Sequence, residues 1–432
     1  MSKTVDIHVK HVTRVEGHGN IRVCAKDGTI EQLEWQVPEA PRFFEAMVRG
    51  RKFEDIQTIV SRICGICSVT HSLAAIKAIE HGMGIEISEQ TDKLRILTHY
   101  GEQLESHILH VGYLVTPDLL GQKSVVPVVG THPDVVNTVI DLHRLGNLVM
   151  TKLAGRKTHP VRLVPGGFSM LPTAKDLREL RQEFVDAVPK LTALAEVVAS
   201  LAGGLPDFSR DTEYIALKND PTYPFYHGKI ASTDTDQLTS AQDFEGVVNE
   251  YMVSQSTAKW AKWHRDSYMV GALARFNLNG DKLAPLAKKT AEMLGLKQGC
   301  CNPYMNSVVQ VVESVQVVER SIELIDEILT AGIQHERPNY KVCAGNGAAA
   351  VEAPRGILFH RYEFDDNGLC VAANISIPTN QNHGNIQKDF EALVPQIIHL
   401  DQDVIRQQME MLVRAYDPCI SCSTHYLDVE FV

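Results

Sequence analysis

The sequence lacks long apolar runs and clusters of positive charge. No stretch of about 18 consecutive apolar residues occurs, so we expect no membrane-spanning helix. Residues 1–10 contain no apolar signal core. Lys and Arg number 42 against 53 Asp and Glu, without a basic run, which argues against nucleic-acid binding. We therefore expect a cytoplasmic chain with no direct membrane insertion and no nucleic-acid partner.

The chain also lacks internal repeats, low-complexity tracts and linkers rich in Gly, Ser or Pro. Its hydrophobic residues make up 44% and its charged residues 22%, which is usual for a folded globular protein and excludes general disorder. The simplest organisation is a single domain over residues 1–432.

The hydrophobic pattern predicts a mainly α fold, a large bundle of long helices with small antiparallel β appendages. Residues 1–40 alternate in polarity around a turn at 26–28 and predict an N-terminal β meander. Apolar residues recur at helical spacing in several later segments, namely 41–49, 70–83, 92–113, 134–154, 174–203, 306–332 and 385–415. A helix over 306–332 would be about 40 Å long, and helices of that length usually pack as bundles.

Two further segments depart from the helical pattern. Residues 355–377 alternate around the turn Asp365-Asp366-Asn367-Gly368 and predict a second β appendage, a hairpin. Residues of about 204–240 are rich in Asp, Thr, Pro, Tyr and Gly, and we expect an irregular insertion at the surface there.

Two Cys-x-x-Cys pairs lie near opposite ends of the chain. The first is formed by Cys64 and Cys67, and the second by Cys419 and Cys422. Cysteines at this spacing on a helical or Gly-containing turn can bind one metal together, and four thiolates favour zinc, iron or nickel. Zinc ribbons usually separate their pairs by about 15–20 residues, far less than the separation here. Spacing alone leaves structural zinc, chance pairs without metal and a redox pair open.

The residues that flank the two pairs resemble the RxCGxCxxxH and DPCxxCxxH signatures of the large, catalytic subunit of nickel–iron hydrogenases. The first signature runs from Arg62 to His71 and the second from Asp417 to His425. Other family-like segments stand in order along the chain: Arg14-Val15-Glu16-Gly17-His18, Arg42-Phe43-Phe44-Glu45, His107-Ile108-Leu109-His110, His159-Pro160, Pro165-Gly166-Gly167, Glu352-Ala353-Pro354-Arg355-Gly356 and Pro378-Thr379. The resemblance covers nearly the whole chain.

The resemblance implies a nickel–iron centre held by the four cysteines. Cys64, Cys67, Cys419 and Cys422 would bind nickel, and Cys67 and Cys422 would also bridge to an iron that carries carbon monoxide and cyanide. A Lewis-acidic metal beside a base can split H2 heterolytically. His71 is implied as a hydrogen-bond donor to a bridging sulfur, with a packed helix histidine as the alternative.

The same resemblance gives roles to charged residues near the centre. Glu16 is the candidate first proton acceptor, with a structural carboxylate as the alternative. Arg355 resembles the arginine whose guanidinium lies over the open metal position, where a fixed cation stabilises charge. Asp118 is a candidate counter-ion for Arg355. His18 is either a neighbour of the centre or a packed side chain.

Glu45 and His425 resemble the ligands of a separate hard-cation site, occupied by magnesium or iron near the C-terminus. Magnesium prefers oxygen ligands, so the carboxylate suits it better than the imidazole does. In the family, many large subunits carry an extension that a protease removes after this histidine. We therefore expect residues 426–432 to be a removable tail or the mark of a form that needs no processing.

The other five cysteines form no CxxCxxC run and predict no iron–sulfur relay in this chain; they are Cys24, Cys300, Cys301, Cys343 and Cys370. Electrons must therefore pass to an iron–sulfur small subunit. The motif sequences resemble those of cytosolic multisubunit hydrogenases linked to NAD(P), ferredoxin, a deazaflavin or a heterodisulfide. This resemblance implies further flavin or iron–sulfur subunits. We expect catalysis on H2 and protons. Alternatives are a regulatory hydrogen sensor, a structural relative in complex I-like assemblies, and a zinc-stapled protein.

Overall fold

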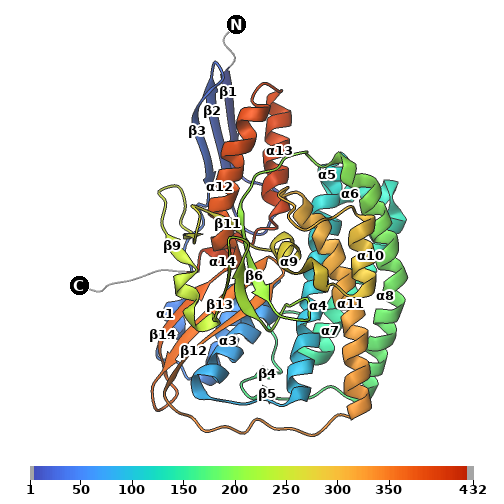
Figure 1. Ribbon diagram of the computed structural model, residues 1–432, viewed down its shortest axis with the longest axis vertical. Helices are drawn as coiled ribbons and strands as arrows, with labels where there is room; N and C mark the ends of the chain where they lie inside the picture. The colour runs from blue at the N-terminus through green and yellow to red at the C-terminus, as the bar shows by residue number, and fades with distance from the viewer. Residues whose placement is uncertain (1–3, 426–432) are drawn as a thin grey trace, which may run out of the picture.

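The computed structural model describes residues 4–425. The tail predicted at 426–432 lies outside the described residues. Figure 1 shows long helices packed side by side on the right of the molecule, and the larger sheets on the left, where some of the other helices also lie. Within the described range, none of the helices combines the length and the apolar character that a bilayer crossing requires.

The α-helices account for the main part of the fold, which confirms the prediction of a mainly α protein. They are α1 (Phe44–Val48), α2 (Phe53–Val60), α3 (Ser68–Met83), α4 (Glu89–Leu109), α5 (Thr116–Leu119), α6 (Val125–Thr131), α7 (Pro133–Ala154), α8 (Ala174–Leu201), α9 (Ala272–Asn279), α10 (Pro285–Met293), α11 (Met305–Ala331), α12 (Pro378–Ile397), α13 (Gln402–Ala415) and α14 (Ile420–Ser423). Short 3-10 helices are η1 (Ser61–Ile63), η3 (Ala202–Gly204), η4 (Ala241–Gly246) and η5 (Gly280–Lys282), and η2 (His110–Val115) is a π-helix.

The long helices α4, α7, α8 and α11 form the predicted bundle (Figure 1). Local signals set their ends. The Ser88 side chain accepts a hydrogen bond from the Thr91 amide at the start of α4, and Thr173 and Asp176 form a capping box at the start of α8. Helix α7 ends at Gly155, whose φ of 82° suits glycine.

The strands form small sheets, as predicted, and most pairs are antiparallel. They are β1 (Thr4–Val9), β2 (Asn20–Lys26), β3 (Thr29–Gln36), β4 (Leu163–Val164), β5 (Gly167–Phe168), β6 (Glu213–Lys218), β7 (Lys229–Ser232), β8 (Thr235–Thr239), β9 (Asn249–Tyr251), β10 (Trp260–Lys262), β11 (Tyr268–Met269), β12 (Gly345–Ala353), β13 (Gly356–Phe364) and β14 (Cys370–Ser376). The predicted N-terminal meander is the antiparallel sheet β1-β2-β3. Its Trp35 is buried, and the indole Nε1 donates to Nδ1 of His383 on α12 at 3.0 Å.

The predicted hairpin at 355–377 is confirmed as β13 and β14, but it belongs to a larger sheet. Strand β12 pairs with β13, and helix α3 packs closely against β12. A Cβ atom at Gly347 would lie 2.1 Å from the Ala78 carbonyl oxygen, so glycine permits this approach. The sequence did not predict β12, because its Gly- and Ala-rich residues carry little strand signal.

The expectation of an irregular insertion at about 204–240 is wrong in its secondary structure, and only part of the segment lies at the surface. Strands β6, β7 and β8 lie in this segment, and residues 213–217 of β6 are all buried. Strand β6 pairs with β7 and, in parallel, with β11. The polar composition misled because Glu213 is itself buried, where it accepts hydrogen bonds from the Ser232 hydroxyl at 2.6 Å and from the His264 amide at 3.2 Å.

Candidate metal centre

Four cysteines from the two ends of the chain meet in the interior. All four are buried, and their sulfur atoms lie within 4.8 Å of one another. Each pair faces the other, since the Cys64 sulfur lies 3.6 Å from that of Cys419 and the Cys67 sulfur 3.9 Å from that of Cys422. The Cys419 and Cys422 sulfur atoms also contact each other as a disulfide. A sulfur that ligates a metal as a thiolate is not in a disulfide, so metal binding requires this pair in its reduced form.

Backbone contacts hold the C-terminal cysteine segment against the N-terminal one. Residue Glu16 forms an isolated parallel bridge with Cys419, and its carbonyl oxygen accepts a hydrogen bond from the Ile420 amide at 3.0 Å. The Arg42 guanidinium donates to the carbonyl oxygens of both Ile63 and Ser421. Arg42 thereby joins the residues beside the two Cys pairs, a role that the sequence did not assign to it.

The start of helix α3 places the two thiols of the first pair in different surroundings. Cys67 is the N-cap of α3, and the amides of Ile66 and Cys67 donate to the Cys64 sulfur at 3.3 and 3.0 Å. Burial raises the pKa of Cys64, but the hydrogen bonds from Cys67 and the charge of Arg355 bring it below its ordinary value overall. The hydrogen bond with Cys64 and burial hold the pKa of Cys67 well above its ordinary value. Cys64 is thus the more acidic thiol of the pair.

A small cavity adjoins the sulfur atoms. Cys67, Cys419 and Cys422 line it together with Arg355 and His71, and Thr379 and apolar residues complete the wall. The Cys419 amide donates to the Thr379 hydroxyl at 3.0 Å, which anchors the second pair at the start of α12. The site therefore combines soft sulfur donors with one cation in an interior of low polarity.

Arg355 lies at the cavity, as predicted, but its counter-ion is Asp417. Its guanidinium donates to Asp417 Oδ1 at 2.9 Å and to the Ser106 hydroxyl at 3.2 Å, and its side chain is 3% exposed. The prediction that Asp118 pairs with Arg355 is wrong. Asp118, on the short helix α5, instead pairs with Arg14 and with Arg414 of α13.

A buried ionic cluster contacts the backbone just before Arg355, and the sequence did not predict this cluster. Arg275 donates to the carboxylates of Glu313, at 2.6 Å, and Glu352, at 3.0 Å, and to the carbonyl oxygens of Ala353 and Pro354. All three charged side chains are fully buried. Arg275 therefore fixes the backbone immediately before Arg355. The available signal was a charged residue, Glu313, within the apolar stretch of a long helix.

Glu16 lies at the edge of the centre and is half-buried. Its carboxylate accepts a hydrogen bond from the Ser421 amide at 3.1 Å, between the two cysteines of the second pair. His18 is placed elsewhere: its Nε2 lies 2.9 Å from both the Lys10 carbonyl and Asn20 Oδ1, and its ring stacks on His11. Of the two alternatives for His18, the structure places it as a packed side chain.

Glu45 and His425 lie together, as the resemblance implies. Glu45 Oε1 is 3.6 Å from His425 Nε2 and accepts a hydrogen bond from the Ile375 amide at 2.8 Å, while His425 Nε2 lies 2.7 Å from the Ile375 carbonyl oxygen. Burial raises the pKa of Glu45, but His425 lowers it overall. Burial lowers the pKa of His425, but Glu45 raises it overall. A carboxylate, a carbonyl and an imidazole thus converge on one buried point.

His71 lines the cavity, but its ring Nδ1 contacts a second histidine rather than a sulfur atom. That nitrogen lies 3.1 Å from His360 Nε2. Burial lowers the pKa of His71 to about 3, so the ring is neutral at neutral pH.

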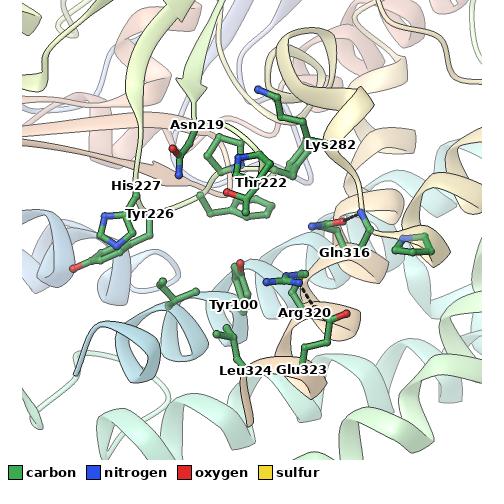
Figure 2. A pocket seen from close by; sticks show the side chains of 17 residues that line it. Tyr100, Asn219, Thr222, Tyr226, His227, Lys282, Gln316, Arg320, Glu323 and Leu324 are labelled. Carbon is green, nitrogen blue, oxygen red and sulfur yellow. Dashed lines mark hydrogen bonds and ion pairs between the residues drawn. The ribbon is translucent and has the colours of Figure 1, made fainter. Parts of the chain in front are cut away.

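A separate hollow of about 240 Å³ lies between α4, α11 and the loop after β6, away from the sulfur atoms. Figure 2 shows aromatic and charged side chains around it. Its charged groups have partners, since Arg320 pairs with Glu323, and Lys282 pairs with Asp220 at 2.6 Å. No predicted site residue lines this hollow.

Comparisons with known proteins agree with the family resemblance that the motifs indicate. Residues 42–127 match the family model of nickel-dependent hydrogenases. Sulfhydrogenase 1 subunit alpha of Pyrococcus furiosus is 33% identical over 424 residues, which cover 97% of each chain. The NAD-reducing hydrogenase HoxS subunit beta of Cupriavidus necator is 26% identical over 465 residues, or 96% of this chain and 94% of that one.

Solved structures share the whole architecture. A crystal structure of an NAD+-reducing NiFe-hydrogenase in the H2-reduced state superposes with a TM-score of 0.88 at 26% identity, covering 97% of this chain and 99% of the other. The Ni-Fe-Se hydrogenase of D. vulgaris Hildenborough has a TM-score of 0.80 at 21% identity, which shows the same fold.

Proposed function

The chain belongs to the nickel-dependent hydrogenase family, and from this premise we propose the roles of its site residues. It is the catalytic subunit of a nickel–iron hydrogenase, an oxidoreductase that acts on H2. These relatives are named as hydrogenase subunits, which does not favour the alternative of a hydrogen sensor. The observation that carries the assignment is the convergence of four buried sulfur atoms within 4.8 Å.

The donor set fits the family's metal centre. Four thiolates in a buried site select soft or borderline metals, and nickel and iron are among them. We infer that Cys64, Cys67, Cys419 and Cys422 hold the nickel and that Cys67 and Cys422 also bridge to an iron with carbon monoxide and cyanide ligands. When bound, the centre supplies the Lewis acidity that polarises H2 for loss of a proton to a base.

Arg355 would provide a fixed positive charge at the cavity. Asp417 and Ser106 orient its guanidinium, and Arg275 holds the backbone behind it. A cation held in place in a site of low polarity stabilises negative charge without reorganisation during the reaction. We assign Arg355 to this electrostatic role.

Glu16 would accept the first proton. Its carboxylate lies beside the second Cys pair, and because the residue is half-buried it adjoins both the protein interior and the solvent. A carboxylate that alternates between protonated and ionised forms can pass a proton outward at this boundary.

Glu45 and His425, with the Ile375 carbonyl oxygen, would hold a magnesium or iron ion. Hard cations favour the two oxygen donors, and retained waters usually complete their coordination. The His425 Nδ1 lies 2.9 Å from the Cys422 carbonyl oxygen, so this ion would stabilise the second Cys segment.

Electron transfer requires a partner. Among the residues that the structure describes, the four cysteines are the one group of three or more Cys, His, Asp or Glu side chains placed to hold a metal, so no iron–sulfur cluster site accompanies them there. The relatives are named as subunits of larger hydrogenases. We infer an iron–sulfur small subunit, with further flavin or iron–sulfur subunits beyond it. A cytoplasmic location stays a prediction from the sequence.

H2-dependent viologen reduction by the purified complex tests the proposed function. We expect sustained turnover by the wild type and about a 10²–10³-fold loss in Arg355→Lys with nickel retained, because lysine cannot contact Asp417 and Ser106 together. Arg361→Lys, on the same strand β13 but outside the cavity, is the matched control and should keep the wild-type rate. A trace rate in the wild type would instead support the sensor.

A further inference from the structure

Three buried side chains form a hydrogen-bonded row that ends at the metal cavity. His71 Nδ1 lies 3.1 Å from His360 Nε2, and His360 Nδ1 lies 2.6 Å from the Tyr362 hydroxyl. All three residues are at most 1% exposed. His71 comes from α3, whereas His360 and Tyr362 stand two residues apart on β13 and so point to the same face of the sheet.

The tyrosine sets the direction of these hydrogen bonds. Within residues 4–425, the Tyr362 hydroxyl has one recorded hydrogen-bond partner, His360 Nδ1. A buried hydroxyl donates its proton wherever an acceptor is in reach, because an unused donor in the interior is costly. Tyr362 therefore donates to Nδ1, and this nitrogen must carry a lone pair.

The proton then has one place on each ring. A neutral imidazole carries a single proton, so an acceptor Nδ1 in His360 requires a proton on its Nε2. That Nε2–H donates to Nδ1 of His71, which leaves the His71 proton on Nε2. The His71 ring lines the cavity with Cys67 and Cys422, so its remaining nitrogen becomes a donor on the metal side.

We propose that Tyr362 and His360 are positioning residues that fix the His71 proton on Nε2, so that His71 donates a hydrogen bond to a thiolate sulfur of the centre. This inference rests on the proposed metal site for its acceptor. The reverse direction would leave the Tyr362 proton without an acceptor and would turn a lone pair of His71 toward electron-rich thiolates. Groups that orient a histidine near a metal commonly set its tautomer in this way.

The tautomer can be measured in the metal-loaded complex, in a diamagnetic state, with 15N-labelled histidine. Long-range 15N–1H spectra show which ring nitrogen bears the proton, and the signals lost in His71→Gln identify this ring. We expect the proton on Nε2 in the wild type. A wild-type proton on Nδ1 overturns the proposal without any variant having to fold.

Tyr362→Phe tests whether the row sets this state. Without the hydroxyl, the ratio of the two His71 tautomers should shift by about tenfold toward Nδ1–H, the value of one ordinary hydrogen bond. The infrared bands of the iron ligands should shift with it. Tyr304→Phe is the matched control, because it removes a buried hydroxyl that donates to the Gln408 carbonyl away from the cavity.

The variants separate this inference from the proposed function. The infrared shift caused by Tyr362→Phe should vanish in the His71→Gln background, since the effect passes through His71. An unchanged tautomer ratio in Tyr362→Phe, or an equal infrared shift in Tyr304→Phe, overturns the proposal. Nickel and iron content is measured on every sample, so a failure of the metal assignment appears there and not in the tautomer.

Discussion

Arg275→Met is the sharpest test of how the protein supports its centre. Within residues 4–425, Arg275 is the one Arg or Lys side chain that contacts the buried carboxylates of Glu313 and Glu352, and it also donates to two carbonyl oxygens. Methionine removes all of these contacts while it keeps much of the volume. Breaking a buried ion pair costs about 3–5 kcal/mol, and each buried acceptor left without a donor adds about 1–3 kcal/mol. We expect a loss of about 4–8 kcal/mol.

The assay is urea denaturation of the purified chain, followed by fluorescence. With an m-value of about 3 kcal/mol per M, the predicted loss of about 4–8 kcal/mol lowers the urea midpoint by about 1–3 M. Arg275→Lys keeps the charge but not the forked geometry, so it should fall between the wild type and Arg275→Met. Arg181→Met is the control, because its ion pair with Asp326 is about half exposed to solvent, which screens the two charges, and its loss should leave the urea midpoint nearly unchanged.

The defect should depend on pH in a defined direction. Burial raises the pKa of Glu313, but Arg275 and His107 lower it to about 2 overall. The resulting stabilisation is full above the unfolded pKa of about 4.5 and is lost as the pH falls toward 2. Burial raises the pKa of Glu352 to about 7, so its ionisation opposes folding increasingly as the pH rises from about 4.5 to 7.

Loss of Arg275 removes the cation that lowers the pKa of both carboxylates, so in the variant both stay protonated up to a higher pH and their ionisation near neutral pH becomes more costly. The difference between the variant and the wild type should therefore be larger at pH 7 than at pH 5. A midpoint shift no larger than that of Arg181→Met, or a defect that is the same at both pH values, would refute this reasoning.

Three other predictions concern the site and its frame. Cys64→Ser should lower nickel affinity by about 10²-fold or more, whereas Cys24→Ser, outside the cluster, should retain the metal; equal nickel content in both would exclude Cys64 as a ligand. Glu16→Gln should keep both metals but slow H2/D2O exchange by about 10²–10⁴-fold, and an unchanged exchange rate would remove Glu16 from the proton path. Gly347→Ala should destabilise the protein by about 1–3 kcal/mol in thermal unfolding, because its Cβ would lie 2.1 Å from a backbone oxygen of α3. Gly130→Ala is the control and should not destabilise the protein, because its Cβ would meet nothing within 4 Å. Similar melting curves for the two variants would contradict the packing argument.

The sequence predicted those parts of the fold that have a strong periodic signal. The 27 residues of α11 and the meander β1-β2-β3 have a clear apolar period, and both formed as expected. Strand β12 was missed because small residues at Gly345–Ala353 have no period, although α3 needs their small size for its close approach. Strand β6 was missed because its burial depends on partners far away in sequence.

The site shows the same division between local and distant information. Motif resemblance found the four cysteines, Arg355, Glu45 and His425, and the structure brings each group together. It did not find the partners that orient these residues. Asp417 lies inside a recognised motif. That Arg355 pairs with Asp417, and not with Asp118, depends on tertiary packing. Arg275 and His360 lie outside every recognised motif.

The central claim is that the four sulfur atoms hold a nickel–iron centre. The most direct test is metal analysis of the anaerobically purified complex together with its infrared spectrum. We predict about one nickel bound by the cysteine cluster per chain, iron in addition, and bands of carbon monoxide and cyanide in the region where protein does not absorb. Zinc in the cluster without nickel or iron, or nickel-replete enzyme without those bands, would contradict the account.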